Sequence, residues 1–144
     1  MSDLDKAVTQ VIDTYRSAVL AKDVKTLMWL YDPDVCVFDA WGVWSYRGAE
    51  AWQRAVEGWF TSLGTEKCRV RFDDIATWGG REFTMLGAVV TYAGESADGQ
   101  PLRAMQNRLS WGLCTSGHVL RIVHEHTSAP IGFEDMKAIL ERTT

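Results

Sequence analysis

The spacing of the apolar residues changes once along this chain of 144 residues, close to Gly64. Before that glycine, apolar side chains recur every three or four residues, which is the period of a helix with one buried face. After it they recur at every second residue, which is the period of a strand. Helices followed by consecutive strands are typical of an α+β domain, whereas a parallel sheet would need helices between its strands.

The helical half predicts three helices. Ser2 or Asp3 caps the first, and Asp23 caps the second, because short polar side chains accept hydrogen bonds from the free N–H groups of a first turn. The turn Asp32-Pro33-Asp34 ends the second helix. A strand at residues 35–39 and an aromatic connection follow before the third helix. The three predicted helices cover residues 3–22, 23–30 and 48–63.

The second half predicts four consecutive strands. The strand at residues 82–92 is apolar on both faces, which indicates cover on both sides, and in a chain this small we expect a second copy to supply one cover. The last two strands form a hairpin around Thr115-Ser116-Gly117, and residues 133–142 predict a short final helix. We expect one domain, residues 1–144, with helices on one face of a curved antiparallel sheet. The strands are predicted at residues 67–72, 82–92, 102–113 and 119–128.

Composition excludes several classes of function. The 15 basic and 19 acidic residues give a net charge of −4, so we expect neither nucleic acid nor an anionic membrane as a partner. Three cysteines without a CxxC pair disfavour a disulfide framework or a zinc knuckle. The acidic N-terminus lacks the pattern of a signal peptide, and no apolar run is long enough to span a membrane. We therefore expect a cytoplasmic protein.

Tryptophan is the one unusual feature of the composition, with seven residues in the chain. Large flat side chains at this density either fill a core or line a pocket for an apolar ligand. If there is a pocket between helices and sheet, we expect its walls to come from the aromatic residues near the third helix. These candidate wall residues are Trp41, Trp44, Tyr46, Trp59 and Phe60.

Asp39 is the first candidate for chemistry. The two-residue period places it on the apolar face of its strand, beside Val35 and Val37. Burial there would raise the pKa of the carboxyl group and suit it to act as a general base. The same aspartate could equally cap the turn that follows it, since Asp before a glycine-containing loop commonly does so.

The last strand contains the pair His124 and His126, which could provide two metal ligands but would need a third from elsewhere. We expect no metal. The period directs Asn107 and His124 toward the helices, where each must hydrogen-bond either a structural partner or a ligand. The same period directs Arg108 and Glu125 to the opposite face, where they would form an ion pair across the strands.

Several of these runs resemble one family. Asp23-Val24, Leu30-Tyr31-Asp32-Pro33-Asp34-Val35, Phe38-Asp39 and Tyr46-Arg47-Gly48 resemble the SnoaL-like branch of the nuclear transport factor two-like superfamily. The run from Arg121 to Pro130 is similar to the last strand of that fold, and also to the association domain of calcium/calmodulin-dependent protein kinase II. The resemblance implies a cone-shaped, cystatin-like roll with three helices in the concave face of the sheet.

The steroid isomerases of this superfamily are the sharpest enzymatic comparison. Their helix-one tyrosine matches Tyr15, their general base matches Asp39, and their second oxyanion donor falls near Asn107. The resemblance implies binding of an apolar or carbonyl-bearing small molecule and proton transfer next to the carbonyl without a cofactor. In that interpretation His124 and His126 join the aromatic residues in binding the ligand. The kinase resemblance instead implies a non-catalytic oligomerisation module. The strand that is apolar on both faces predicts a homodimer through the convex face.

Overall fold

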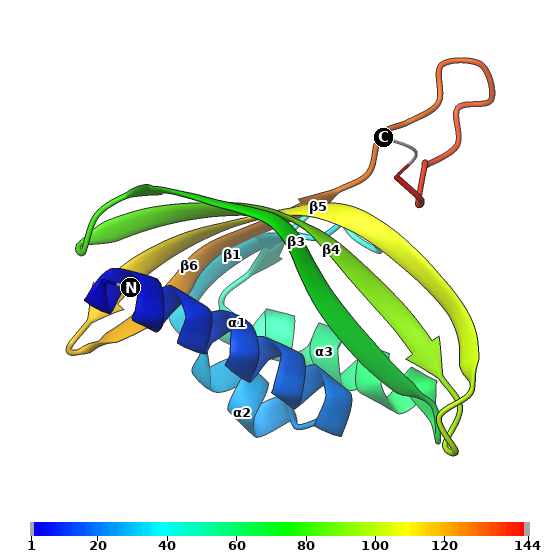
Figure 1. Cartoon of the computed structure of the whole chain (residues 1–144), viewed down its shortest axis with the longest axis horizontal. Helices are drawn as coiled ribbons and strands as arrows, with labels where there is room; N and C mark the ends of the chain where they lie inside the picture. The colour runs from blue at the N-terminus through cyan, green and yellow to red at the C-terminus, as the bar shows by residue number, and fades with distance from the viewer. Residues whose placement is uncertain (1, 143–144) are drawn as a thin grey trace.

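One mixed sheet of six strands holds three helices in its concave face in the computed structural model, which describes residues 2–142 (Figure 1). The strands lie in the order β2-β1-β6-β5-β4-β3, and neighbours are antiparallel except for β1 and β6, which run parallel. The α+β class and the curved sheet are thus confirmed. The elements are α1 (Asp3–Ala21), α2 (Val24–Trp29), β1 (Tyr31–Phe38), β2 (Tyr46–Arg47), α3 (Ala49–Leu63), β3 (Lys67–Gly79), β4 (Phe83–Glu95), β5 (Pro101–Ser116) and β6 (Val119–Ser128).

The two predicted helix caps are present. The Ser2 hydroxyl accepts a hydrogen bond from the N–H of Asp5, whose carboxylate accepts from the N–H of Ser2 in return, which is a capping box. The Asp23 carboxylate likewise accepts from the N–H of Thr26 at the start of α2. These bonds satisfy N–H groups that have no partner within the helix.

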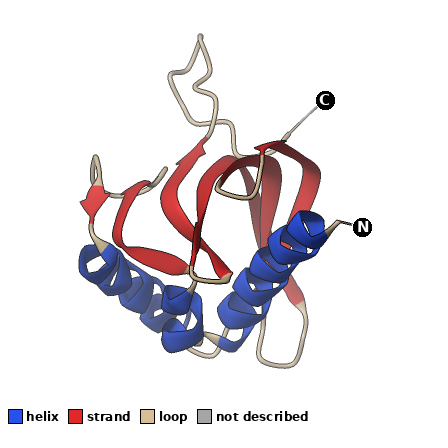
Figure 2. Ribbon diagram, turned by 90° about the vertical axis from the view of Figure 1, so that its left-hand side faces the viewer, coloured by secondary structure: helices blue, strands red, loops and turns tan. Residues whose placement is uncertain are grey.

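Burial explains the layering, because each helix buries one face against the sheet (Figure 2). From α1 the buried face includes Val11, Tyr15 and Val19, and these contact the apolar face of β3–β6. Two strand residues, Trp111 and Leu86, lie fully buried beneath them. The cavity described below lies between this packed region and the open end of the sheet.

The last segment of the chain is not the short helix that its apolar spacing predicts. Residues 130–139 form a compact turn, in which the N–H of Gly132 donates to the carbonyl of Lys137. Leu140 then lies beside β5, where its carbonyl accepts a 2.7 Å hydrogen bond from the N–H of Gln106. The prediction was wrong because β6 ends at Ser128 and leaves the edge of β5 open, and pairing with that edge satisfies the backbone.

A bulge at Val123 shapes the second half of β6. Ile122 pairs with Leu113 and His124 with Gly112, so Val123 has no partner across the ladder. One extra residue in a strand reverses the direction of every later side chain. Ile122 and Glu125 therefore both lie on the concave face, although they are three positions apart in the sequence.

Among the described helices, none is long and apolar enough to cross a membrane.

Candidate functional site

A cavity of about 670 Å³ lies between α1, α3 and the concave face of the sheet. Indole, aliphatic and phenol side chains make up most of its wall, and a few polar groups interrupt them. Leu140 of the C-terminal segment closes part of it. A cavity of this size and character is typical of sites for small apolar molecules. Its polar and titratable lining groups are Tyr15, Asp39, Tyr46, Ser62, Cys68, Tyr92, Arg103, Asn107 and Glu125.

Asp39 directly follows β1 and lies in the wall of this cavity. Burial raises the pKa of its carboxyl group, and hydrogen bonds from the hydroxyl of Thr127 and nearby backbone N–H groups partly oppose that rise. The Thr127 hydroxyl donates to Oδ1 at 3.0 Å and itself accepts from the N–H of Ala40 at 2.8 Å. The carboxylate is therefore held in one orientation at the cavity wall.

Tyr15 and Tyr92 face each other across the cavity wall, with 3.0 Å between their hydroxyl oxygens. Burial raises the pKa of Tyr15 well above its ordinary value and also raises that of Tyr92. Both phenols therefore stay protonated at neutral pH. Because one O–H group serves the bond between them, the second remains available to a ligand.

Asn107 lies on β5 in the same cavity and is only 6% exposed. Its Oδ1 is fully buried and has no hydrogen-bond partner within residues 2–142. A buried amide oxygen without a partner costs about 1–3 kcal/mol, so a ligand that donates a hydrogen bond to it would gain affinity. Asn107 therefore lies where the sequence predicted, on the helix-facing side of the sheet.

Glu125 is the residue that the sequence prediction missed. It is 2% exposed and lines the cavity, instead of pairing with Arg108 on the opposite face. Two donors reach its Oε1, the hydroxyl of Tyr31 at 2.6 Å and Nε1 of Trp111 at 2.9 Å. Burial raises the pKa of Glu125 to about 7, and the negative charge of Asp39 adds to the rise, while both hydrogen bonds oppose it.

The prediction for Glu125 was wrong because it assumed that side chains alternate between the two faces along the whole strand, and the bulge at Val123 breaks that alternation. Arg108 donates instead to the Ser128 hydroxyl at 3.1 Å. No signal in the sequence marks Glu125, because Glu125 and Thr127 are polar and fit the solvent-facing set of a regular strand.

The bulge also corrects the placement of the two histidines. His124 lies on the convex face, where its ring is 5.1 Å from that of Phe38, and its Nδ1 lies 2.8 Å from the carbonyl oxygen of Cys36. His126 also packs edge-on against Phe38, with ring centres 5.6 Å apart, and the two imidazole ring centres are 6.3 Å from each other. The expectation that His124 points toward the helices was therefore wrong. Among the described residues, no three His, Cys, Asp or Glu side chains gather as a metal site would require.

The aromatic residues separate into three groups. Trp41, Tyr46 and Trp59 line the cavity, as the sequence predicted for its walls. Phe60 is buried in the core beside Trp59, outside the cavity lining. Trp44 is 97% exposed and, with His126, borders a separate hollow of about 400 Å³. Ligand contact by any of these residues stays a prediction.

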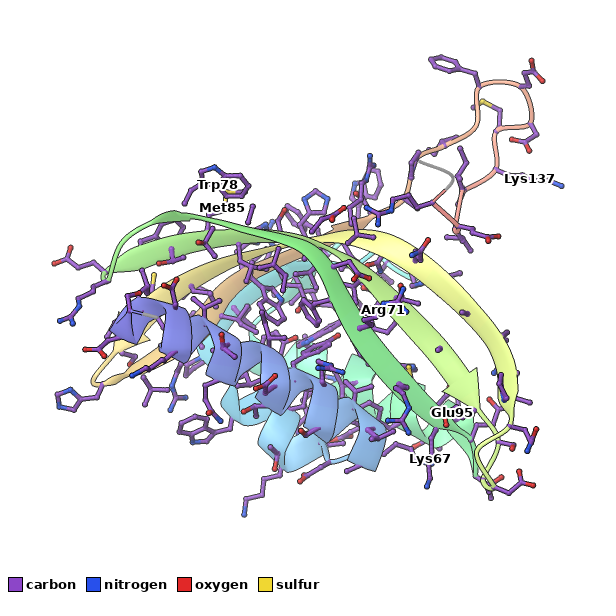
Figure 3. All side chains as sticks on the ribbon, in the orientation of Figure 1. Lys67, Arg71, Trp78, Met85, Glu95 and Lys137 are labelled. Atoms are coloured by element: carbon purple, nitrogen blue, oxygen red, sulfur yellow. The ribbon has the colours of Figure 1, made fainter. Side chains whose placement is uncertain are left out.

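The convex face of the sheet presents an apolar patch, Trp78, Phe83 and Met85, on the two strands farthest from β1. Trp78 pairs with Met85, and Figure 3 shows both side chains pointing away from the helices. All three patch residues are largely exposed. The basic residues of β3 are solvated, as expected, since Arg69 pairs with Glu95 and Arg71 with Asp73 at the surface.

Comparisons with known proteins agree with this architecture. A family model for SnoaL-like domains matches residues 8–132. A nuclear transport factor two-like protein of unknown function from Pseudomonas putida is 20% identical, with a TM-score of 0.84 over 100% of this chain and 99% of that chain. A protein from Xanthomonas campestris, proposed to be a calcium/calmodulin dependent protein kinase II association domain, is 17% identical, with a TM-score of 0.73 and 85% of each chain covered.

An uncharacterised protein with a cystatin-like fold from Caulobacter vibrioides is 16% identical, with a TM-score of 0.69 over 88% of this chain and 89% of that chain. No curated protein matches the sequence. At these identities the solved structures establish the fold alone. The match of the family model over most of the chain establishes more, and this protein belongs to the SnoaL-like domain family.

Proposed function

We propose that the protein binds an apolar, carbonyl-bearing small molecule in the cavity and transfers a proton next to the carbonyl, with Asp39 as the base. One observation carries the proposal: a carboxylate with a raised pKa lies in the wall of a mostly apolar cavity of about 670 Å³. A base works best when its pKa approaches the working pH, and burial moves that of Asp39 in this direction. The reaction requires no cofactor.

The neighbouring polar groups support the same chemistry. Removing a proton beside a carbonyl places negative charge on the carbonyl oxygen, which hydrogen-bond donors must stabilise. The Tyr15–Tyr92 pair has one hydroxyl proton to spare, and the Asn107 amide offers N–H groups. In this proposal Tyr15 and Asn107 therefore stabilise the oxyanion, while the indoles of Trp41 and Trp59 hold the apolar part of the ligand.

Two probes test this function separately for binding and for proton transfer. Quenching of 2-naphthol fluorescence measures binding of an aromatic enol mimic, and exchange of the α-hydrogens of 2-tetralone in heavy water, followed by NMR, measures proton transfer. We expect Asp39→Asn to bind 2-naphthol as the wild type does and to lose exchange by about 100-fold or more, the usual contribution of a general base.

The matched control is Asp34→Asn, which removes a carboxylate from an exposed position on β1, the strand that Asp39 follows. It should leave both binding and exchange unchanged. Wild-type exchange rates in Asp39→Asn would reject Asp39 as the base. A wild-type protein that neither binds 2-naphthol nor exchanges 2-tetralone would reject the function as a whole. Native mass spectrometry of the purified protein would reveal any ligand that it retains.

The exposed apolar patch favours a second candidate function, a non-catalytic oligomerisation module. Soluble monomers seldom expose clustered large apolar side chains, and Trp78, Phe83 and Met85 lie together on the convex face. We propose that two copies pair through this face as a homodimer. The cavity opens on the other side of the sheet, so a homodimer is compatible with both candidates. If the module is purely structural, cavity substitutions will change stability alone.

A further inference from the structure

We propose that Glu125 is a second acid–base group of the cavity and acts together with Asp39 on one enolisable ligand, Asp39 taking a proton from carbon while Glu125 gives one to oxygen. This inference rests on the function proposed above. The sequence directed Glu125 to the opposite face, so the argument for it comes from the tertiary structure alone.

The hydrogen bonds of Glu125 indicate which of its oxygens carries the proton. Both donors, Tyr31 and Trp111, reach Oε1. Oε2 takes no hydrogen bond from the described residues, and it is not among the fully buried atoms that lack a partner. Since Glu125 lines the cavity and both donors occupy Oε1, we infer that Oε2 faces the cavity. A proton on the carboxyl group therefore sits on Oε2, where a ligand can receive it.

The surrounding groups favour one shared proton between the two carboxyls. Tyr15 of α1, Tyr31 of β1 and Tyr92 of β4 face Glu125, and all three phenols have raised pKa values that keep them neutral. From α3 the cavity receives Trp52, Ala55, Val56, Trp59, Ser62 and Leu63, none of which titrates. Arg103 is the cation in the lining, and its guanidinium pairs with Glu66 at 2.5 Å.

The carboxylate of Asp39 is thus the charge that acts on Glu125, and it disfavours ionisation of Glu125. Two carboxyl groups that share a poorly solvated space tend to hold one proton between them. Burial raises the pKa of Glu125 further than its hydrogen bonds lower it. Below about pH 7 Glu125 therefore holds a proton, and in the proposed pair Asp39 is the carboxyl that is ionised.

The proton movements balance without any other reactant. Asp39 takes a proton from the carbon beside the carbonyl, and the electrons of the broken C–H bond form a C=C bond. The carbonyl π electrons move to oxygen, which takes the proton from Oε2 of Glu125 and yields a neutral enol. In the second half Asp39 returns its proton to the same or a conjugated carbon, and Glu125 recovers the enol proton.

The charge of the site stays constant in each half of this sequence, because one carboxyl gains a proton as the other loses one. A free enolate in a cavity of low polarity would be costly, and direct protonation of its oxygen avoids that charge. The arrangement also defines the ligand class. One negative charge already resides on the carboxyl pair, so the pair disfavours an anionic ligand. We therefore assign the cavity to a neutral, mostly apolar, enolisable ketone.

Glu125→Gln tests the assignment, with Glu82→Gln as the control at an exposed position. The glutamine keeps the shape and the neutral charge of the protonated side chain, so binding of 2-naphthol should remain. Exchange of 2-tetralone should fall about 100-fold. In the wild type, exchange should also decline as pH rises past the pKa of Glu125, about 7, and Glu125→Gln should lack that decline.

The outcomes separate the two proposals. If Glu125→Gln exchanges 2-tetralone at the wild-type rate with the wild-type pH profile, while Asp39→Asn does not, then the pair is rejected and Asp39 alone remains the base. If both variants exchange normally, both Asp39 as the base and the acid–base pair are rejected. A wild-type protein without exchange rejects both.

An NMR titration of wild-type protein labelled with carbon-13 at the glutamate carboxyls tests the pair without depending on how the variant folds. Glu125 should be protonated at about pH 6 and ionised at about pH 8. Its titration midpoint should move down in Asp39→Asn, because the neighbouring charge is gone. A Glu125 carboxyl already ionised at about pH 5 in the wild type would overturn the inference.

Discussion

Tyr31 donates a hydrogen bond of 2.6 Å to Oε1 of Glu125, and this bond joins the first residue of β1 to the middle of β6. It lies in the region where two irregularities meet, since β1 changes register against β6 between Tyr31 and Cys36, and β6 itself bulges at Val123. Together these irregularities direct the titratable side chain of Glu125 into the cavity. Several predictions about stability and assembly depend on this arrangement and on the convex face.

The buried carboxyl of Glu125 should make stability depend on pH. Its pKa rises from 4.5 to about 7 on folding, so the folded protein binds more protons than the unfolded chain between those values. The free energy of unfolding should therefore fall as pH rises through this window, by about 3 kcal/mol from Glu125. Urea unfolding at a series of pH values measures it. Glu125→Gln should remove most of the slope, and Glu82→Gln should retain it.

Removal of the Tyr31 hydroxyl should destabilise the protein most when Glu125 is ionised. Tyr31→Phe takes away a donor to a carboxylate, and hydrogen bonds to charged groups contribute about 1.5–3 kcal/mol. The loss lifts the pKa of Glu125 further, because this bond now lowers it. Urea unfolding above and below neutral pH measures both effects. Tyr46→Phe, which removes another phenol hydroxyl from the cavity wall, is the control. Equal losses at both pH values would contradict the prediction.

Two adjacent glycines at the turn between β3 and β4 should respond differently to an added methyl group: Gly79 should not accept it, and Gly80 should. At Gly79, φ is +107°, and an added Cβ would lie 2.4 Å from the carbonyl oxygen of Phe83. At Gly80 nothing lies within 4 Å of an added Cβ. Gly79→Ala should therefore cost about 2 kcal/mol or more, while Gly80→Ala should change stability by less than about 1 kcal/mol. Thermal unfolding of both variants provides the comparison; similar melting temperatures would contradict it.

A charge on the apolar patch should separate the proposed homodimer. Met85→Lys places an ammonium group among Trp78 and Phe83, and burying that charge in an interface is costly. Native mass spectrometry should show a wild-type dimer and a folded monomeric variant. Val43→Lys, at an exposed apolar residue in the loop before β2, should remain dimeric. A monomeric wild type, or a dimeric Met85→Lys, would reject this interface.

Much of the fold could be read from the chain, because local rules decide it. The three helices, their caps at Ser2 and Asp23, and the change to a two-residue period all depend on neighbours within a few positions. The resemblance added the cone shape and the concave placement of the helices. The positions of Tyr15, Asp39 and Asn107 in one cavity also agree with prediction, because the strand parity at the last two holds without interruption.

The sequence predictions that were wrong concern features that depend on contacts between distant segments. The C-terminal segment does not form the helix that its apolar spacing predicts, because β6 ends at Ser128 and leaves the edge of β5 free to pair with it. No local sequence pattern indicates this pairing. The same kind of cause placed Leu140 in the cavity wall. The parallel pairing of β1 with β6 likewise joins residues nearly ninety positions apart.

The sequence by itself thus determined where the three N-terminal helices and most of the strands form, and which face of most strands is buried, because side-chain period and capping are local. The tertiary structure alone decided which titratable groups share the cavity. A single unpaired residue, Val123, moved His124 out and Glu125 in, since one inserted position reverses every side chain after it. Burial then raised the pKa of a carboxyl that would have remained an ordinary surface charge on the other face.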